Sequence, residues 1–541
     1  MERLEFMVYG LQFMVYSLQK NMKKNIIYIA LLGVMSLMTV SCNSELDIEK
    51  HGNMGSMETY YTTDENINTA SASLYLEMRS LYYNWFFTKN LLSDDSWCGG
   101  GQRGDNGEME KLNEYTFDSN HGMIESLYKG LYGVIYKANL IIDKTEGDTP
   151  VMKHAINEAK VFRAFGHFEL ASLFGTAPVV DHLLTTDEYR QTNGTAADLW
   201  AVVEKDLTEA IGSGTLPSKS DANDAETGIR VTKEYAQALL GKAYLFQGKY
   251  SEAAAMLDNV ISSNKYALYP EFDAQFHALY NNNCESLFEL QKRYDTEQMW
   301  NQFDMLFLMQ GWRTSVLMYS GQALTELATG TYGFFNPRKS LYDAFVAWEG
   351  ADGYRLKKSI MTYEQIKAYG VDLQPGAAVY GNEGYFYWKN QSLKSDVIVD
   401  MSFFQGGQYI DLKVMRYAEV LLMAAEAQLQ AGNASKALQY VNEVRSRAKE
   451  TPLTSVSLND IKTEKRLELC NEAIRYQDLV RWGDAKTAMA EQGKQVPAFT
   501  TNGVQWNWQN TKYGFQDKNV LLPIPLKELE LNPNMQANVG W

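Results

Sequence analysis

The chain has 541 residues, of which 45% are hydrophobic, and a formal net charge of −16 from 50 Lys and Arg against 66 Asp and Glu. This composition excludes a disordered or fibrous protein, because it provides enough apolar surface for a large core. The acidic balance excludes a nucleic-acid partner, which would need clustered Lys and Arg to displace counterions. Aromatic residues make up 13% of the chain, so rings are expected at its surface as well as in its core.

The N-terminal segment has the pattern of an export signal. Lys23 and Lys24 precede an uncharged apolar run over residues 26–40. This run is shorter than the ~20 residues that span a bilayer comfortably, and a basic start before a short apolar run is typical of a signal peptide. We therefore predict a signal peptide over residues 1–41, with Met22 as a candidate for the real translation start.

The apolar run ends in a pattern that resembles a lipobox, where a bacterial signal peptidase cuts before a cysteine that receives diacylglycerol. Ser41 directly precedes Cys42, although Thr39 stands where Leu is usual. We predict lipidation at Cys42, followed by a lipidated polar tether over residues 42–56. An ordinary secretory peptide with an incidental cysteine is the alternative.

The other cysteines and the histidines show no sign of a metal site or a disulfide framework. Acylation of Cys42 leaves Cys98, Cys284 and Cys470, and an odd number does not suit a disulfide-based fold. Cys470 lies in an apolar-periodic run, which predicts a buried small side chain. No His or Cys pair has zinc-ligand spacing, and the HExxH, GxSxG and GxxxxGK[ST] motifs are absent. We therefore predict neither a metal nor a cofactor.

One glycine-rich stretch matches the GxGxxG pattern of dinucleotide-binding loops. Its glycines are Gly99, Gly101 and Gly104. Polar residues precede it where that site needs a buried strand, and no apolar helix follows. We interpret the stretch as a flexible loop.

Helical periodicity dominates much of the chain beyond the tether. Apolar residues recur at every third or fourth position over 65–83, 126–144 and 154–174, and the last segment stops before Gly175 and Pro178. These segments predict a mainly α-helical protein.

Two later segments, 231–261 and 416–448, repeat one spacing of small residues. In each, a helix is followed by a glycine turn and by a second helix that opens with alanine, which is the pattern of a tetratricopeptide unit. Two unrelated helical hairpins are the alternative. The matched positions are Ala243, Gly248 and Ala253 in the first segment, and Ala427, Gly432 and Ala437 in the second.

Residues 280–415 combine weak helical periodicity with many Gly, Asn and aromatic residues, and long irregular segments of this kind usually carry function. Aromatic faces can stack on the flat C–H faces of sugar rings while polar side chains bind the hydroxyls. Core packing is the alternative for each ring. The predicted stacking residues are Trp97, Trp300, Trp312 and Tyr319, and the predicted hydrogen-bonding residues are Asp94, Gln102 and Arg313.

Catalysis has no positive support in the sequence. Two carboxylates could perform glycoside hydrolysis, and Asp94 and Asp95 form one of many possible pairs. With 66 acidic residues, such pairs arise by chance. We therefore predict no enzymatic activity, with a surface glycosidase as the alternative.

Several segments together resemble the SusD/RagB family of outer-membrane lipoproteins. They are NEAKVFRAFGHFELASLFGTAPVV (157–180), LKVMRYAEVLLMAAEA (412–427), EKRLELCNEAIRYQDLVRWG (464–483) and LLPIPLKELELNPNMQANVGW (521–541). The third segment departs from the family pattern in having Ala473 where Gly is usual, and the last one has one extra residue. The family motifs carry no ligand residues. Their charged residues are instead predicted to pair within the scaffold; these are Arg416, Glu419, Arg475, Asp478 and Arg481.

The resemblance implies a SusD-like, mainly α fold in which tetratricopeptide-type hairpins pack against a loop-rich region. It divides the mature chain into an N-terminal helical region (57–230), a tetratricopeptide unit (231–274) and a C-terminal region with the ligand loops and the second hairpin (275–541). It also implies a lipid-anchored outer-membrane protein of the cell surface that binds oligosaccharides for a SusC-like TonB-dependent transporter in polysaccharide utilisation. Peptide capture by the same fold and a purely structural scaffold are the alternatives.

Overall fold

The computed structural model describes residues 57–297, 304–398, 407–508 and 514–541. The chain divides into two units, Met1–Tyr60 and Tyr61–Trp541, and the second is a single compact body. The only described element of the first unit is the short helix α2 (Met57–Tyr60). The predicted signal peptide, Cys42, the tether and Trp300 lie outside the described residues. Among the described residues, no helix combines the length and the apolar character needed to cross a membrane.

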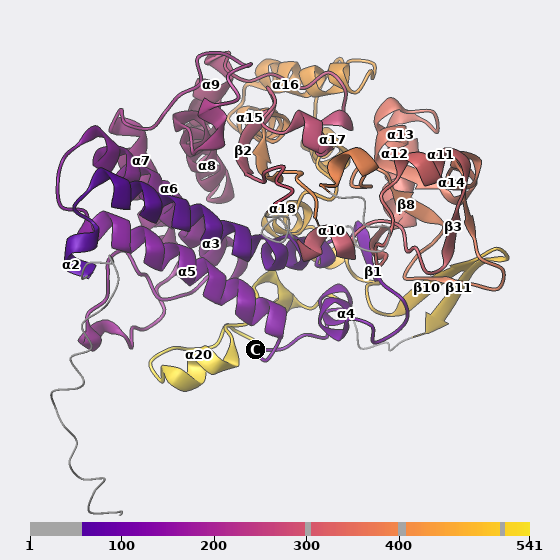
Figure 1. Cartoon of the computed structure of the whole chain (residues 1–541), viewed down its shortest axis with the longest axis horizontal. Coiled ribbons are helices and arrows are strands. Elements are labelled where there is room, and N and C mark those ends of the chain that lie inside the picture. The colour runs from indigo at the N-terminus through magenta and orange to yellow at the C-terminus, as the bar shows by residue number, and fades with distance from the viewer. Residues whose placement is uncertain (1–56, 298–303, 399–406, 509–513) are drawn as a thin grey trace, which may run out of the picture. The chain divides into compact units, whose positions relative to one another are not determined.

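Four long helices open the second unit and pack on one another in succession (Figure 1). They are α3 (Asp64–Leu91), α5 (Gly122–Lys144), α6 (Pro150–Leu173) and α7 (Ala196–Gly212). The first three correspond to the three helices predicted from periodicity, but α3 extends beyond the predicted end at residue 83. Its last turns are rich in buried aromatic residues such as Trp85 and Phe87. These turns are buried on all sides and include Lys89 and Asn90 among the buried residues, so they show no amphipathic pattern to detect.

Both segments with the repeated spacing form helical hairpins. The first contains α8 (Lys233–Phe246) and α9 (Tyr250–Ser262), and the second contains α15 (Tyr417–Gln430) and α16 (Ala434–Arg447). Helix α15 also packs on α9, which joins the two hairpins. The turns contain Gly248 at φ +71° and Gly432 at φ +89°, a backbone conformation that favours glycine.

The remaining elements are short, as expected for the irregular part of the chain. The other helices are α4 (Gly107–Glu114), α10 (Met305–Met309), α11 (Gly321–Glu326), α12 (Lys339–Glu349), α13 (Tyr354–Ser359), α14 (Tyr363–Tyr369), α17 (Leu458–Glu468), α18 (Arg475–Trp482), α19 (Ala485–Ala488) and α20 (Leu526–Leu531).

The strands form small antiparallel sheets, and most of the pairings join distant parts of the chain. The pairs are β1 (Ser96–Gly99) with β4 (Phe334–Pro337), β2 (Ser286–Leu290) with β9 (Leu412–Arg416), β3 (Leu317–Tyr319) with β6 (Val371–Leu373), and β5 (Ile360–Thr362) with β8 (Tyr385–Tyr387). One sheet has three strands, in the order β11 (Gly503–Trp508), β10 (Gln495–Thr500) and β7 (Val379–Tyr380).

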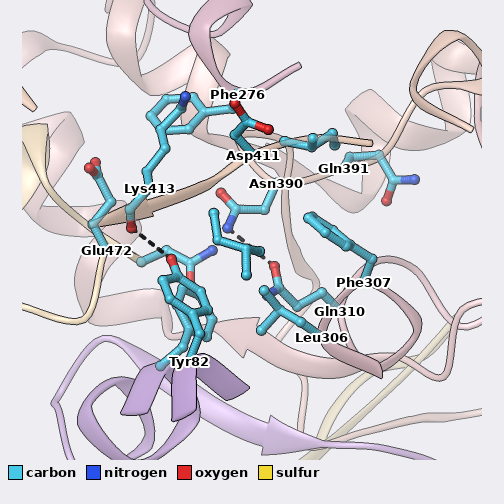
Figure 2. A pocket seen from close by; sticks show the side chains of 14 residues that line it. Tyr82, Phe276, Leu306, Phe307, Gln310, Asn390, Gln391, Asp411, Lys413 and Glu472 are labelled. Carbon is cyan, nitrogen blue, oxygen red and sulfur yellow. Dashed lines mark hydrogen bonds between the residues drawn. The ribbon is translucent and has the colours of Figure 1, made fainter. Parts of the chain in front are cut away.

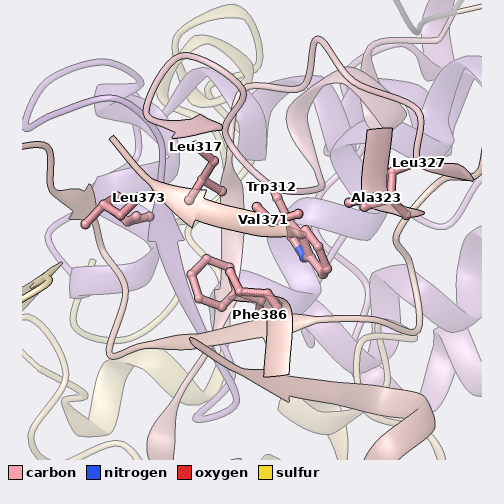
Figure 3. Packing of buried hydrophobic residues seen from close by; sticks show 9 residues of the cluster. Trp312, Leu317, Ala323, Leu327, Val371, Leu373 and Phe386 are labelled. Atoms are coloured by element: carbon pink, nitrogen blue, oxygen red, sulfur yellow. The ribbon is translucent and has the colours of Figure 1, made fainter. Parts of the chain in front are cut away.

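A cluster of buried apolar side chains supports the short strands (Figure 3). Trp312 lies inside it and packs among residues of β3, β6, β8 and α11, including Leu317, Val371 and Phe386. Strands of three residues have too few hydrogen bonds to be stable alone, so this packing is what holds them together.

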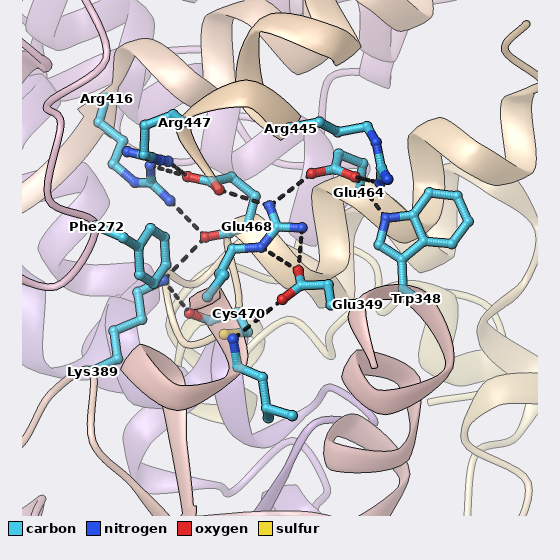
Figure 4. Close-up of polar contacts among 12 residues, drawn as sticks. Phe272, Trp348, Glu349, Lys389, Arg416, Arg445, Arg447, Glu464, Glu468 and Cys470 are labelled. Carbon is cyan, nitrogen blue, oxygen red and sulfur yellow. Dashed lines mark hydrogen bonds and ion pairs between the residues drawn. The ribbon is translucent and has the colours of Figure 1, made fainter. Parts of the chain in front are cut away.

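A buried cluster of ion pairs joins the helical repeats to the irregular region (Figure 4). Arg416 bonds to Glu285 and Glu468 at 2.6 Å each, and Arg355 of α13 bonds to Glu464 at 2.7 Å and to Glu468 at 2.8 Å. Arg447 of α16 also pairs with Glu468. Each charge in this interior is therefore compensated by opposite charges, which buried ions require.

The charged motif residues pair within the scaffold, as predicted. Glu419 accepts from Lys242 at 2.7 Å, and Asp478 and Arg481 bond to each other at 2.8 Å. Cys470 is also buried, at 1% exposure. The motif positions thus form the framework on which the loops are held.

Candidate functional site

Strand β1 places Trp97 at a junction between the helices and the irregular region. Trp97 lies opposite Asn336 in the β1–β4 pair. Its indole Nε1 donates to Glu383 Oε2 at 2.8 Å, and the same carboxylate oxygen accepts from the Lys339 backbone N–H at 2.8 Å. The guanidinium of Arg338 lies 3.5 Å from the centre of the Trp97 ring. These contacts fix the indole and leave it only 5% exposed.

A second tryptophan, Trp506, presents the open aromatic surface beside Trp97. It lies on β11, is 47% exposed, and meets Trp97 edge-to-face with a centroid separation of 6.0 Å. Side chains alternate along a strand, so Val504, which is also exposed, shares a face with Trp506. The β10–β11 hairpin thus supplies an exposed ring that the buried Trp97 cannot supply.

The two rings border a groove with a volume of about 340 Å³, named here the Trp97–Trp506 groove. Its rim carries an ion pair, in which Lys494 donates to Glu491 at 2.8 Å. This volume falls within the ~300–1,000 Å³ of typical ligand sites, and the groove combines aromatic surface with a few polar groups. The lining residues are Trp97, Arg338, Ser340, Glu383, Glu491, Lys494, Gln495 and Trp506.

The glycine-rich loop that follows β1 places two predicted residues on one surface. Gln102 is exposed, and Arg313 donates to the backbone carbonyl of Tyr332 at 2.7 Å. A Cβ on Gly101 would lie 2.4 Å from the Arg313 guanidinium, so a larger residue there would displace the end of the Arg313 side chain.

The local structure of this loop differs from the expectation in one way. A short buried strand, β1, leads into the glycines and ends at Gly99, and it is held by tertiary contacts that periodicity does not report. The eight-residue helix α4 that follows the loop is polar, so it is not the apolar helix that a dinucleotide site needs. The strand also pairs antiparallel with β4, so the parallel βαβ unit of a dinucleotide site is not formed here.

The predicted stacking role of Trp312 is wrong. Its ring is 2% exposed within the apolar cluster of Figure 3, and its Nε1 donates to the backbone carbonyl of Tyr387 at 3.0 Å. Tyr319 packs against the same cluster, and its hydroxyl donates to the Trp312 carbonyl at 3.1 Å. Burial also raises the pKa of Tyr319. Both rings therefore support the core, where they pack with the other apolar side chains of the cluster.

Asp94 is also not available as a ligand-binding group. It is 9% exposed and accepts two hydrogen bonds from Arg475, at 2.8 and 2.9 Å. Although burial opposes it, the charges of Arg475 and Arg466 hold the pKa of Asp94 well below its usual range. Asp95 is bound by Arg466 at 2.7 Å. The two carboxylates are thus committed to structural ion pairs, as the motif residue Arg475 was predicted to be, and not to hydrolysis.

Another pocket lies deeper, between α3, α10 and β9 (Figure 2). Its lining includes Tyr82, Asn390, Asp411 and Lys413, and its volume is about 60 Å³. Tyr82 donates to the Lys413 carbonyl at 2.7 Å across one side of the cavity. A water molecule occupies about 30 Å³ of liquid, so the cavity accommodates about two waters and no sugar ring.

Two larger hollows run along the outer face of α3, with volumes of about 540 and 850 Å³. Leu76 and Arg79 line both. Within the part of the chain that the structure describes, their linings contain no tryptophan and none of the predicted site residues. The Trp97–Trp506 groove is therefore the stronger candidate for binding a ligand.

Trp506 was missed in the sequence, although a signal was present. Asn502-Gly503 is a turn signal, and the alternation of the run that follows it places Val504 and Trp506 on one face of a strand. A tryptophan at this place in such a run predicts an exposed ring on a sheet. The run lies outside residues 280–415, where most of the aromatic stacking residues were predicted.

The described residues contain no group of three or more His, Cys, Asp or Glu side chains that could hold a metal ion. The groove itself contains two carboxylates, Glu383 and Glu491, and no histidine.

Two family models match the chain. One, described as the SusD family, matches residues 284–541, and the other, described as "Starch-binding associating with outer membrane", matches residues 46–245. The curated relatives include SusD-like protein P2 of Formosa agariphila, which is 26% identical over 93% of this chain and 97% of its own length. A SusD-like protein of Bacteroides ovatus is 24% identical over 85% of this chain and 83% of its own.

Solved structures share the fold. A laminarin-binding SusD-like protein is 26% identical, with a TM-score of 0.75 over 89% of this chain and 100% of its own. Surface glycan-binding protein A from Bacteroides thetaiotaomicron, solved with laminarihexaose, is 21% identical, with a TM-score of 0.69 over 88% of this chain and 99% of its own. At that identity, the second match shows the fold alone.

These matches confirm the resemblance found in the sequence and the mainly helical SusD-like fold. The matched descriptions name starch binding, laminarin binding and a complex with laminarihexaose, which agrees with the prediction that the chain is not an enzyme. Since the two models together cover most of the chain from residue 46 to its end, this protein belongs to the SusD/RagB family.

Proposed function

We propose that this protein captures oligosaccharides at the cell surface and passes them, uncleaved, to a SusC-like TonB-dependent transporter. The observation that carries the proposal is the Trp97–Trp506 groove. It presents the half-exposed ring of Trp506 beside donors and acceptors of both charges, within a volume of about 340 Å³. Stacking on an aromatic face with a few polar contacts gives modest affinity, which suits a protein that must release its ligand.

The nature of the ligand is supported by the relatives. A structural relative of 26% identity is described as laminarin-binding, and a more distant one was solved with laminarihexaose. Laminarin is a neutral β-glucan, and its hexamer is therefore the first probe to use. Gln102, in the loop that follows β1, and Arg313, which packs against that loop at Gly101, offer further polar contacts to a chain longer than one or two sugars.

The cellular setting is proposed from the sequence and the family. The description of one matched model associates the family with the outer membrane. A lipid on Cys42 would anchor the protein, and docking on a transporter would supply the second interaction that stable attachment usually needs. Replacement of Cys42 by Ala should move the protein from the membrane fraction to the periplasmic or secreted fraction; an unchanged fraction would contradict the lipid anchor.

The binding function is tested by a glycan-array screen. The variant to use lacks residues 1–42 and keeps every described residue. We expect selective, saturable binding to one class of oligosaccharide and none to a peptide array of the same density. Selective binding to peptides alone would contradict the proposal and favour peptide capture by the same fold.

A further inference from the structure

Arg338 is a buried cation with unusually few partners. It is 9% exposed, and its Nε donates to the Ser96 carbonyl at 3.2 Å. Its Nη2 is buried without a hydrogen-bond partner. Among the described residues its guanidinium lies against the Trp97 ring and forms no ion pair with a carboxylate. Buried arginines are almost always paired, as Arg355 and Arg416 are in this protein.

The largest compensating charge on Arg338 comes from Glu383, which accepts a hydrogen bond from Nε1 of the same indole. Burial lowers the pKa of Arg338 to about 10, and Glu383 and Asp94 oppose this shift only in part. Arg338 is therefore still charged at neutral pH. One oxygen of Glu383, Oε2, is committed to Trp97 and to the Lys339 backbone, whereas the structure gives Oε1 no hydrogen bond within the described part of the chain.

Arg338 and Glu383 both line the Trp97–Trp506 groove. An arginine can only donate hydrogen bonds and an ionised carboxylate can only accept them, whereas a hydroxyl does both. Neighbouring hydroxyls of one sugar ring can therefore accept from the first group and donate to the second. The positive charge of Arg338 and the negative charge of Glu383 cancel. A ligand that contacts both groups therefore gains no binding energy from a net charge of its own.

We propose that Arg338 and Glu383 form a charge-balanced clamp that binds neighbouring hydroxyls of a neutral sugar ring seated against Trp506. The inference rests on the proposed glycan-binding function and specifies its ligand class. Arg338 alone would favour a uronate or a sulfated sugar, but Glu383 repels these at the same place. The clamp therefore selects neutral over acidic glycans.

Removing one charge at a time tests the clamp. Affinities of the full-length protein in detergent are measured by calorimetry for laminarihexaose and for a hexamer of galacturonic acid. We expect the wild type to prefer the neutral hexamer. Glu383→Gln retains an acceptor for Trp97 and should shift the ratio of the two affinities about tenfold toward the acidic hexamer, whereas Arg338→Gln should shift it about tenfold the other way.

Opposite shifts in the affinity ratio would indicate a role in recognition. A role in folding alone would weaken the binding of both hexamers alike and leave the ratio unchanged. Arg338→Lys retains the charge and should keep the ratio near that of the wild type, even if thermal melting shows reduced stability. Asp352→Asn is the matched control, because this exposed residue lies beyond the far end of α12 from Arg338. It should leave the ratio unchanged.

Three outcomes would overturn the clamp. A wild-type preference for the acidic hexamer would show that Arg338 binds an anionic group. Normal binding with no change of ratio in either charge variant would refute the clamp while the proposed glycan function stands. Failure of the wild type to bind any glycan on the array would refute both.

Discussion

At the scale of single residues, burial separates the tryptophans into different roles. Trp312 is 2% exposed and supports the core, Trp97 is 5% exposed and is held by Arg338 and Glu383, and Trp506 is 47% exposed. The sequence shows that all are aromatic, but it does not show which neighbours cover each ring. Those neighbours come from distant segments, such as Tyr387, whose backbone carbonyl accepts from Trp312 across 75 positions of the chain.

The contrast between these rings gives a first prediction. Trp506→Ala should weaken laminarihexaose binding about tenfold, as measured by calorimetry. The substitution removes an aromatic stacking contact worth about 1 kcal/mol or more. Trp506 is exposed, so its loss should change the free energy of unfolding in urea by less than about 1 kcal/mol. Trp312→Ala should instead cost about 3–5 kcal/mol of stability by leaving a cavity. Equal effects of the two substitutions on stability would contradict this assignment.

Asp478 leads to a prediction about acid stability. It is buried between Lys465 and Arg481. Although burial opposes it, these charges lower its pKa from 3.8 to about 2. A carboxyl whose pKa is lower when folded stabilises the protein fully above about pH 4 and loses that contribution as the pH falls toward 2.

Asp478→Asn should therefore lower stability at neutral pH and flatten the dependence of unfolding free energy on pH between about 4 and 2. Urea denaturation at a series of pH values measures this slope. The control is Asp517→Asn, because Asp517 pairs with Lys486 in an exposed position. If both variants keep the slope of the wild type, Asp478 does not have the lowered pKa.

At the scale of elements, the long helices and hairpins could be predicted from the sequence, whereas the strands could not. A helical period of 3.6 residues repeats within one segment, so α5, α6 and the hairpin α8–α9 are visible locally. Strands such as β1 and β4 contain four residues each and pair across more than 230 positions. Their pairing depends on the tertiary fold, and no local pattern reports it.

The turn glycines provide a test of the hairpin geometry. Gly248 has φ +71°, and a Cβ there would meet no atom within 4 Å. Gly248→Ala should therefore cost about 1–2 kcal/mol from backbone strain alone. The matched control is Gly212, the last residue of α7, which also has open space around it but no positive φ. Gly212→Ala should be neutral or stabilising by up to about 1 kcal/mol. A reversed order in urea denaturation would contradict the turn geometry.

At the scale of the whole molecule, the buried ion cluster fastens the irregular region to the helical repeats. It brings together charges from α12, α13, α16 and α17, and from the residues just before β2 and α15 (Figure 4). The sequence indicated that the motif charges are paired. It could not identify partners such as Arg355 and Glu349, because they lie outside the motifs.

Removing one member of the cluster should destabilise the whole unit. Arg355→Met leaves Glu349, Glu464 and Glu468 less compensated in the interior, so we expect a loss of about 3–5 kcal/mol in urea denaturation. Lys357→Met, on the same helix, breaks an exposed pair with Asp352 and should cost less than about 1 kcal/mol. A loss for Arg355→Met no larger than that for Lys357→Met would show that the cluster does not hold the unit together.

The most direct test of glycan binding without cleavage is to saturate the purified protein with laminarihexaose, measure the bound fraction, and recover the sugar for mass analysis after prolonged incubation. The binding account predicts a saturable complex from which all of the hexamer returns intact. Shorter oligosaccharides in the recovered material, or no retention of this or any other glycan from the array, would contradict it.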